Sequence, residues 1–389
     1  MYFQVHQPFR LKPFNYFSRG SEYFDEGKNR EIFQKVAKKC YIPTTKKIID
    51  LVRRHPEFRV SFSLSGVFIE QAMKYKPEVM DIYRELYDTG NMDILNETYY
   101  HSLAYLISHE EFVEQVKMHR ELIQDIFGHK ANVFRNTEAM LCDDMSRKVE
   151  KMGYKGIVGE GWDNILGWRS PNYIYQPSGS DIKLLLRNYR LSDDIGFRFS
   201  KSDWPEYPLT ADKYASWLAA SRGQTINLFL DYETFGEHQW KETGIFDFLD
   251  YLPREVSKYS NLEWAKISEL TEMDSKDRIE IPHILSWADV DRDLSAWLGN
   301  KMQDCAFRNI KDMGSLVHGT KDSRIIDIWR KMQTSDHFYY MCTKWFSDGD
   351  IHKYFNSYTN PYEAYSNYMN ILKNMKSEMG IKLLNRQKV

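Results

Sequence analysis

Two carboxylates follow a short apolar run near the middle of the chain, in the segment INLFLDYETFGEHQW at residues 226–240. The run has the length of a strand and ends at Leu230, and Asp231 and Glu233 come directly after it. Side chains two positions apart in an extended chain point to the same face, so a continued strand would present both carboxylates together. A carboxyl group at the mouth of a buried strand can exchange protons with a bound substrate. The segment therefore predicts an acid or base at the carboxyl end of a strand.

Polar and titratable side chains also follow other predicted strands. They are His6 with Gln7 after the first strand, Asp93 and Glu97 around the third, and Glu138 after the fourth. A lone carboxylate in such a place is more often a helix cap, and Glu138 lies only a few residues before a predicted helix. In a barrel of parallel strands, however, the residues after each strand converge on one face. The convergence, rather than any one residue, predicts a functional site.

The elements that must position these residues alternate between strand and helix over about 240 residues. This alternation predicts parallel strands joined by helical crossovers, an α/β fold that closes into a barrel or nearly does. Beyond about Asp291 the strand pattern fades and helical spacing takes over. We expect a barrel over residues 1–292 and a C-terminal helical region over residues 293–389 packed on it. The predicted strands are Tyr2–Val5, Phe58–Leu64, Met92–Leu95, Asn132–Arg135, Gly156–Gly159, Lys183–Asn188 and 226–230; the predicted C-terminal helices are Leu294–Met313, Asp322–Met332 and Pro361–Met379.

Composition excludes several classes of function. The chain has 389 residues, with 53 Lys and Arg against 55 Asp and Glu, so nothing favours a nucleic acid partner. The four cysteines form no CxxC pair, which argues against a structural zinc site or a disulfide framework. No apolar run approaches the roughly 20 residues needed to cross a bilayer, and no leader follows Met1, so we expect a cytoplasmic protein that does not bind membranes. The sequence predicts no oligomeric state.

Aromatic residues make up 15% of the chain, and such rings provide the platforms on which sugars stack. Paired carboxylates and abundant rings, without a phosphate loop, a metal-spaced cluster or a nucleophile elbow, favour glycoside hydrolysis. This chemistry needs one protonated carboxyl group for the leaving oxygen and one ionised carboxylate on the other side of the sugar. A separation of about 5 to 5.5 Å between the two carboxyl groups gives retention of configuration, and about 6.5 to 9.5 Å gives inversion.

Five short motifs in the chain resemble those of glycoside hydrolase family 57, the α-amylase and 4-α-glucanotransferase family, and are most similar to its α-amylases. They are VHQPFR at 5–10, GNMDILNETYYHSL at 90–103, FRNTEAML at 134–141, FLDYETFGEH at 229–238 and SWADVDRDLSAWL at 286–298. The resemblance implies an incomplete seven-stranded (β/α) barrel followed by a helical region. It also implies a retaining enzyme that acts on α-glucans or maltooligosaccharides without a metal or organic cofactor.

Within these motifs, the resemblance implies that Glu138 is the nucleophile and Asp231 the general acid and base. The implied substrate-binding residues are His6, Asp93, Glu97, His101, Glu233, Trp287 and Asp289. The family commonly has a second histidine in the first motif, where this chain has Gln4, which cannot titrate near neutral pH. A core histidine satisfied by the backbone is the simpler interpretation of His6, and a helix start is the simpler interpretation of the segment around Asp289.

The sequence is compatible with three functions. The first is a retaining α-glucan hydrolase, or a 4-α-glucanotransferase that uses the same covalent intermediate with a sugar hydroxyl in place of water. The second is a metal-dependent deacetylase that would bind a divalent ion through His6, Asp231, Glu233 and His238, although no two histidines have the usual close spacing. The third is a non-catalytic protein that binds glucan in an aromatic cleft.

Overall fold

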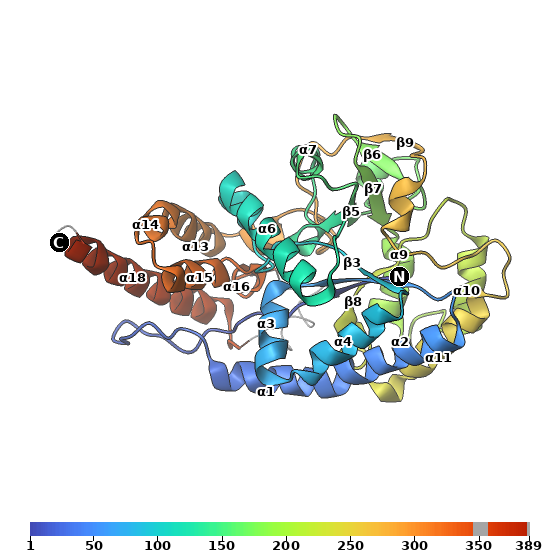
Figure 1. Cartoon of the computed structure of the whole chain (residues 1–389), viewed down its shortest axis with the longest axis horizontal. Helices are drawn as coiled ribbons and strands as arrows, with labels where there is room; N and C mark the ends of the chain where they lie inside the picture. The colour runs from blue at the N-terminus through green and yellow to red at the C-terminus, as the bar shows by residue number, and fades with distance from the viewer. Residues whose placement is uncertain (345–356, 387–389) are drawn as a thin grey trace.

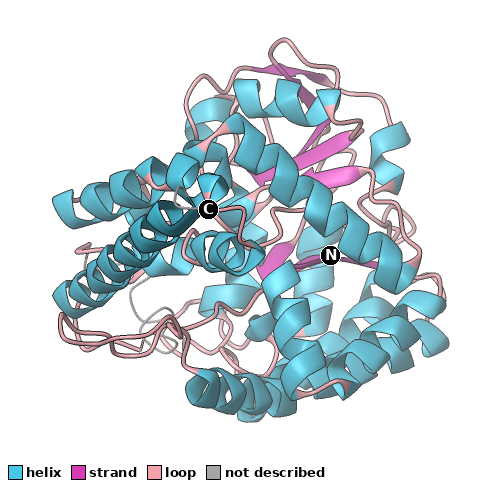
Figure 2. Cartoon of the chain, turned by 60° about the vertical axis from the view of Figure 1, so that its left-hand side comes forward, coloured by secondary structure: helices cyan, strands magenta, loops and turns pink. Residues whose placement is uncertain are grey.

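The computed structural model describes residues 1–344 and 357–386 (Figure 1). Its strands form two sheets that are mostly parallel, with helices around them (Figure 2). One sheet has the order β3-β2-β1-β8 and the other β4-β5-β7-β6-β9. The strands are β1 Tyr2–Val5, β2 Val60–Leu64, β3 Met92–Ile94, β4 Val133–Arg135, β5 Gly156–Glu160, β6 Tyr175–Pro177, β7 Lys183–Arg187, β8 Phe229–Asp231 and β9 Asp277–Ile279.

The first sheet is entirely parallel and is centred on β1. Phe3 of β1 is in register with Phe62 of β2 on one side and with Leu230 of β8 on the other. All four residues of β1 and all five of β2 are buried, as expected for strands covered on both faces. In the second sheet only the pairing of β6 with β7 is antiparallel. An isolated parallel bridge between Asn96 and Phe134 connects the two sheets at the ends of β3 and β4.

Side chains from both sheets meet in one interior apolar cluster. Tyr2, Val133, Val158, Leu185 and Phe229 each come from a different strand and are at most 3% exposed. The predicted α/β class is thus confirmed: the carboxyl ends of strands from both sheets face a common region.

Helices connect most consecutive strands and then follow the last one. Between the strands lie α1 Glu26–Val36, α2 Ile42–Arg54, α3 Gly66–Tyr75, α4 Glu78–Asp88, α5 Ala104–Ile107, α6 His109–Phe127, α7 Asp143–Lys151, α8 Asp163–Leu166, α9 Tyr189–Asp193, α10 Ala211–Ala220 and α11 Ile245–Val256. After β9 come α12 Ser295–Leu298, α13 Lys301–Asp312, α14 Gly314–Gly319, α15 Ser323–Lys331, α16 Ser335–Tyr339 and α18 Pro361–Arg386. Within the described ranges, no helix combines the length and apolarity needed to span a membrane.

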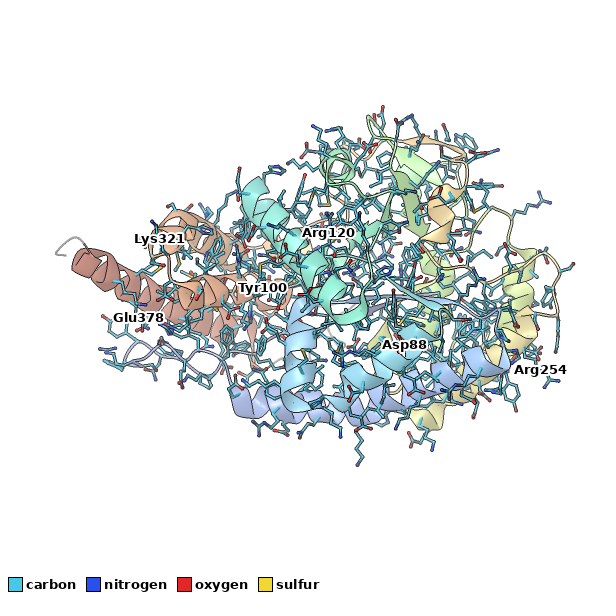
Figure 3. The ribbon with its side chains drawn as sticks, viewed as in Figure 1. Asp88, Tyr100, Arg120, Arg254, Lys321 and Glu378 are labelled. Carbon is cyan, nitrogen blue, oxygen red and sulfur yellow. The ribbon has the colours of Figure 1, made fainter. Side chains whose placement is uncertain are left out.

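The C-terminal helices share a core with the second sheet. Trp297, Trp329 and Tyr368 belong to the same buried cluster as Phe134 of β4 and Leu184 of β7. The hydroxyl of Tyr100, labelled in Figure 3, donates to Asp327 Oδ1 of α15 at 3.0 Å. α12, α15 and α18 therefore pack against strands of the second sheet.

Two local expectations were wrong. The strand before Asp231 begins at Phe229 rather than residue 226, because Asn227 pairs irregularly with the end of β7: its side chain donates to Leu186 O and its carbonyl accepts from Asn188 N. The extended conformation also ends at Asp231, and Tyr232–Thr234 form a 3-10 turn. Asp231 and Glu233 therefore do not lie on one strand face.

Candidate active site

A cavity of about 190 Å³ lies beyond the ends of β4 and β8. Glu138 and Asp231, the two carboxylates with predicted catalytic roles, both line it. Trp287 and Asp289 line it as well, from a loop that follows β9. The alternative interpretation of this segment, a helix start, does not apply, since the first helix after it begins at Ser295. The structure therefore brings together four residues from three of the five motifs.

Glu138 sits in a tight 3-10 turn, Thr137–Ala139, directly after β4. Its backbone is left-handed, with φ 56° and ψ 27°, and Ala139 follows with φ 50°. Non-glycine residues in this region cost of order 1 to 3 kcal/mol and persist where the surroundings impose them, often at functional sites. The strained turn places the carboxylate in the cavity instead of capping α7, so the capping interpretation does not apply to it.

Both oxygens of the Glu138 carboxylate accept hydrogen bonds. Trp287 donates its indole N–H to Oε2 at 2.9 Å, and Ser335 donates its hydroxyl to Oε1 at 2.9 Å. His101 Nε2 lies 3.5 Å from Oε1. Burial on its own would raise the pKa of Glu138, but the hydrogen bond and charge of His101, with the charge of Arg135, lower it to about 2. The carboxylate is ionised at neutral pH and held in one orientation.

His101 links this carboxylate to a second, fully buried one. Its Nδ1 is 2.7 Å from Glu97 Oε2, and its backbone is also left-handed, with φ 48°. Burial lowers the pKa of His101, but hydrogen bonds to Glu138 and Glu97 outweigh burial and raise it to about 9. His101 is thus an imidazolium between two carboxylates.

Glu97 anchors this arrangement from the interior of the sheet. It accepts hydrogen bonds from Gln4 Nε2 at 3.0 Å and from Ser63 Oγ at 2.8 Å, and it is completely buried. Gln4 occupies the position where the family commonly has histidine, and here it acts as a neutral donor to Glu97. Burial raises the pKa of Glu97, but the hydrogen bond and charge of His101 bring it down to about 2.

His6 stacks on His101, with ring centroids 4.1 Å apart and an angle of 21° between the planes. Its ring nitrogens form hydrogen bonds with Ser65 Oγ at 2.8 Å and with Asp336 Oδ2 at 3.0 Å. Burial and the neighbouring His101 lower the pKa of His6. His6 is therefore held by side chains, not by the backbone as a simple core histidine would be.

Of the predicted binding residues, Trp287 and Asp289 line the cavity, and Glu97, His101 and His6 connect to Glu138 from behind its wall. Within the part of the chain that the structure describes, the remaining two predicted binding residues have no hydrogen bond to this network. Glu233 is buried behind Asp231, where it accepts a 2.5 Å hydrogen bond from Tyr41 Oη, and burial with the nearby Asp231 charge raises its pKa to about 8. Asp93 lies within β3, where its Oδ2 accepts from Ser268 N at 2.9 Å. Its side chain is buried and does not line the cavity. Between the two carboxylates of the second motif, Glu97 is the one connected to the site.

Several residues that contact the site were not predicted to act there. Ser335 and Asp336 come from α16, roughly two hundred or more positions away from their partners Glu138 and His6. The guanidinium groups of Arg135 and Arg187 lie 4.6 and 5.8 Å from the centre of the Trp287 ring. These contacts depend on how distant segments fold together, so no local pattern predicts them.

A buried ion network supports the loop that carries Trp287. Glu160 is fully buried at the end of β5 and pairs with Arg187 at 3.1 Å and Arg292 at 3.3 Å. Arg292 also donates to the carbonyl of Trp287. Arg187 and Arg292 both line the cavity, so the same network shapes its wall.

The four residues considered for a metal site are not brought together. Asp231 and His238 line the cavity, whereas His6 is bonded to Ser65 and Asp336 and Glu233 to Tyr41. In residues 1–344 and 357–386, no group of three or more His, Cys, Asp or Glu side chains is arranged to hold a metal ion.

This chain is similar to known proteins in both sequence and structure. Residues 1–282 match the model of glycosyl hydrolase family 57. A putative α-amylase of Methanocaldococcus jannaschii is 48% identical over 387 residues, which cover 95% of this chain and 82% of that one. The GH57-type branching enzyme of Pyrococcus horikoshii superposes with a TM-score of 0.69 at 15% identity, covering 96% and 87% of the two chains. An α-amylase of Thermotoga maritima gives a TM-score of 0.62 at 12% identity, covering 97% and 93%.

Proposed function

Because the chain belongs to glycosyl hydrolase family 57, we propose that it hydrolyses α-1,4-glucans with retention of configuration, as an enzyme of the α-amylase type. The observation that carries the proposal is the shared cavity of Glu138 and Asp231. Glu138 is ionised and fixed by two hydrogen bonds, which suits a nucleophile. The relative of 48% identity, named a putative α-amylase, supports the choice of substrate.

In the first step, an oxygen of Glu138 attacks the anomeric carbon while Asp231 gives its proton to the departing glycosidic oxygen. The bond to the leaving sugar breaks and a glycosyl ester forms on Glu138. In the second step, Asp231 removes a proton from water, which attacks the same carbon and releases Glu138 as a carboxylate. Two inversions give net retention, and all atoms are supplied by substrate, water and the two carboxyl groups.

The surrounding residues then have distinct roles. Trp287 holds the nucleophile through its N–H and presents a ring in the cavity, while Asp289 offers a hydroxyl acceptor. To His6, which is paired with Asp336 and stacked on His101, we assign the binding of sugar hydroxyls at the cleavage point. We assign Glu97 and His101 to the same subsite, where they hold the charge of Glu138.

We also infer that the seven parallel strands β8, β1, β2, β3, β4, β5 and β7 form the incomplete barrel implied by the family. Their shared apolar interior and the bridge between Asn96 and Phe134 support this reading. We divide the chain into a barrel over residues 1–292 and a helical region over 293–389, of which 345–356 and 387–389 lie outside the described residues. We also propose a cytoplasmic location, which is supported by the four cysteines, because none of them forms a disulfide.

Hydrolysis and transfer differ only in the acceptor that reaches the covalent intermediate. We favour hydrolysis because of the α-amylase-named relative. Incubation with maltoheptaose, with chromatography of products and a count of reducing ends, tests this choice. Shorter products with rising reducing ends support a hydrolase. Longer and shorter products at constant reducing ends would instead make the protein a 4-α-glucanotransferase.

A further inference from the structure

A second hollow, of about 410 Å³, lies between the loop before α10 and the outer face of α11. These two helices pack side by side at the end of the molecule opposite α18; Arg254 and Glu378 mark the two ends in Figure 3. Tyr207 and Tyr251 line the hollow and are 47% and 53% exposed. Large aromatic side chains are normally buried, so two exposed rings in one groove need an explanation. We call this hollow the α11 groove.

The groove follows a single face of α11. Gly244, Asp247, Tyr251 and Glu255 line it and are spaced three or four positions apart, the spacing of one helix face. At 1.5 Å per residue this face extends about 16 Å, long enough for several sugar rings in a row.

The chemistry of the groove combines rings with hydrogen-bond acceptors. Asp212, Asp247 and Glu255 contribute carboxylates. They are not gathered for a cation, because no metal-holding group of His, Cys, Asp and Glu occurs among the residues that the structure describes. Tyrosine faces next to carboxylate acceptors match a ligand with apolar ring faces and many hydroxyl donors.

The α11 groove adjoins the candidate active site through two separate segments. Along the first, Phe197 lines the catalytic cavity and Phe199 lines the groove. Along the second, His238 lines the cavity, and Thr243 lines the groove. Two short segments therefore run from the lining of the cavity to the lining of the groove.

Trp240 lies on the second of these segments, between His238 and Thr243 in the sequence. Its side chain is 54% exposed, and Lys39 Nζ is 5.4 Å from its ring centre. A third exposed ring thus belongs to a segment that links the two hollows.

We propose that the α11 groove, reached from the cavity past Trp240, binds the extended part of a long α-glucan chain. This inference rests on the proposed function, since it names the substrate as a long chain whose distant sugars stack on Tyr207 and Tyr251. Short maltooligosaccharides fill the cavity without reaching the groove. The groove then lowers the KM for amylose and leaves the KM for maltotriose unaffected.

The test compares wild type with Tyr207→Ala and Tyr251→Ala on amylose and on maltotriose. Each lost ring is expected to raise the KM for amylose about five-fold, with kcat unchanged, because one stacking contact has been removed. The kinetics on maltotriose stay as in wild type. Tyr251→Phe retains the ring and restores the wild-type KM, and Tyr362→Ala removes a tyrosine that is 67% exposed on α18 and serves as the matched control.

Retardation in native gels containing amylose measures the same binding without turnover. Slower migration of wild type than of the Tyr251→Ala variant supports the groove even if the protein cleaves no glucan tested, so failure of the proposed function is recognised separately. Equal migration and an unchanged KM for amylose would overturn the proposal. An acidic groove with tyrosines also suits a cationic peptide. If the groove binds such a peptide, and that binding is lost in Asp247→Asn and at high salt, then the peptide and not the glucan is its ligand.

Discussion

The indole N–H of Trp287 donates to Oε2 of Glu138 at 2.9 Å, joining two residues 149 positions apart. The backbone N–H of Trp287 also donates to the carbonyl of Glu138, at 3.3 Å. The loop after β9 and the turn after β4 are therefore fixed to one another at the carboxylate that is to carry the sugar.

Replacing Trp287 by phenylalanine keeps a ring against the two guanidinium groups but removes the hydrogen bond to Glu138. A hydrogen bond to a charged group contributes about 1.5 to 3 kcal/mol, so kcat/KM on maltoheptaose should fall about 10- to 100-fold. Trp168→Phe, at a side chain that is 87% exposed, is the matched control and should be silent. A wild-type kcat/KM in Trp287→Phe would show that the hydrogen bond from the indole does not contribute to catalysis.

Asp231→Asn should lower turnover on maltooligosaccharides by at least ~10³-fold, because an amide cannot give a proton to the leaving oxygen. An activated glucoside whose leaving group needs no proton should restore the first step. Burst kinetics with such a substrate measure that step directly. If the activated substrate shows no recovery, Asp231 is not the general acid.

His101→Gln should change the pH dependence of catalysis. The pKa of Glu138 is about 2 because His101 offsets the effect of burial. Without the imidazolium the pKa of Glu138 rises, so a larger fraction of the nucleophile is protonated in mild acid. The acid limb of the profile of kcat/KM against pH should therefore move to higher pH, while thermal unfolding confirms that the variant is folded. An unmoved acid limb would contradict the role given to His101.

Glu233→Gln should change the pH dependence of stability. Burial and the charge of Asp231 raise the pKa of Glu233 to about 8 in the folded protein. Below its ordinary pKa of 4.5 the group is protonated in both states; between 4.5 and 8 only the unfolded chain releases the proton. The free energy of unfolding of wild type should thus decrease relative to the variant as pH rises from 4.5 to 8. Parallel stability curves from denaturant titrations would show that Glu233 is not held protonated.

Much of the fold is readable from local pattern. The strands predicted at residues 2–5, 92–95 and 183–188 and the helix predicted at 322–332 appear within one residue of the expected bounds. The start of β8 was not predicted correctly, because Asn227 forms hydrogen bonds with Leu186 and Asn188 at the end of β7, about forty positions earlier. Local propensity does not report such pairing.

Some residues of the candidate site were predicted from motifs, and others are brought there only by the fold. Glu138, Asp231, Trp287 and Asp289 were expected from motifs and line one cavity. Ser335 reaches Glu138 only because α16 packs against the loop after β3, where Ser335 N donates to His101 O at 3.1 Å. Asp93 was predicted from its place in a motif. It lies within β3, and its buried side chain accepts a hydrogen bond from Ser268 N, a contact that spacing along the sequence does not reveal.

Trapping the covalent intermediate would identify the carboxylate that acts as the nucleophile. A fluorinated maltosyl fluoride, which forms the glycosyl ester faster than water removes it, is incubated with the protein, and proteolytic peptides are examined by mass spectrometry. We predict one glycosyl group, attached to Glu138, and no label in Glu138→Gln. A label on another carboxylate, or release of inverted product with no labelled peptide, would contradict the mechanism proposed for this site.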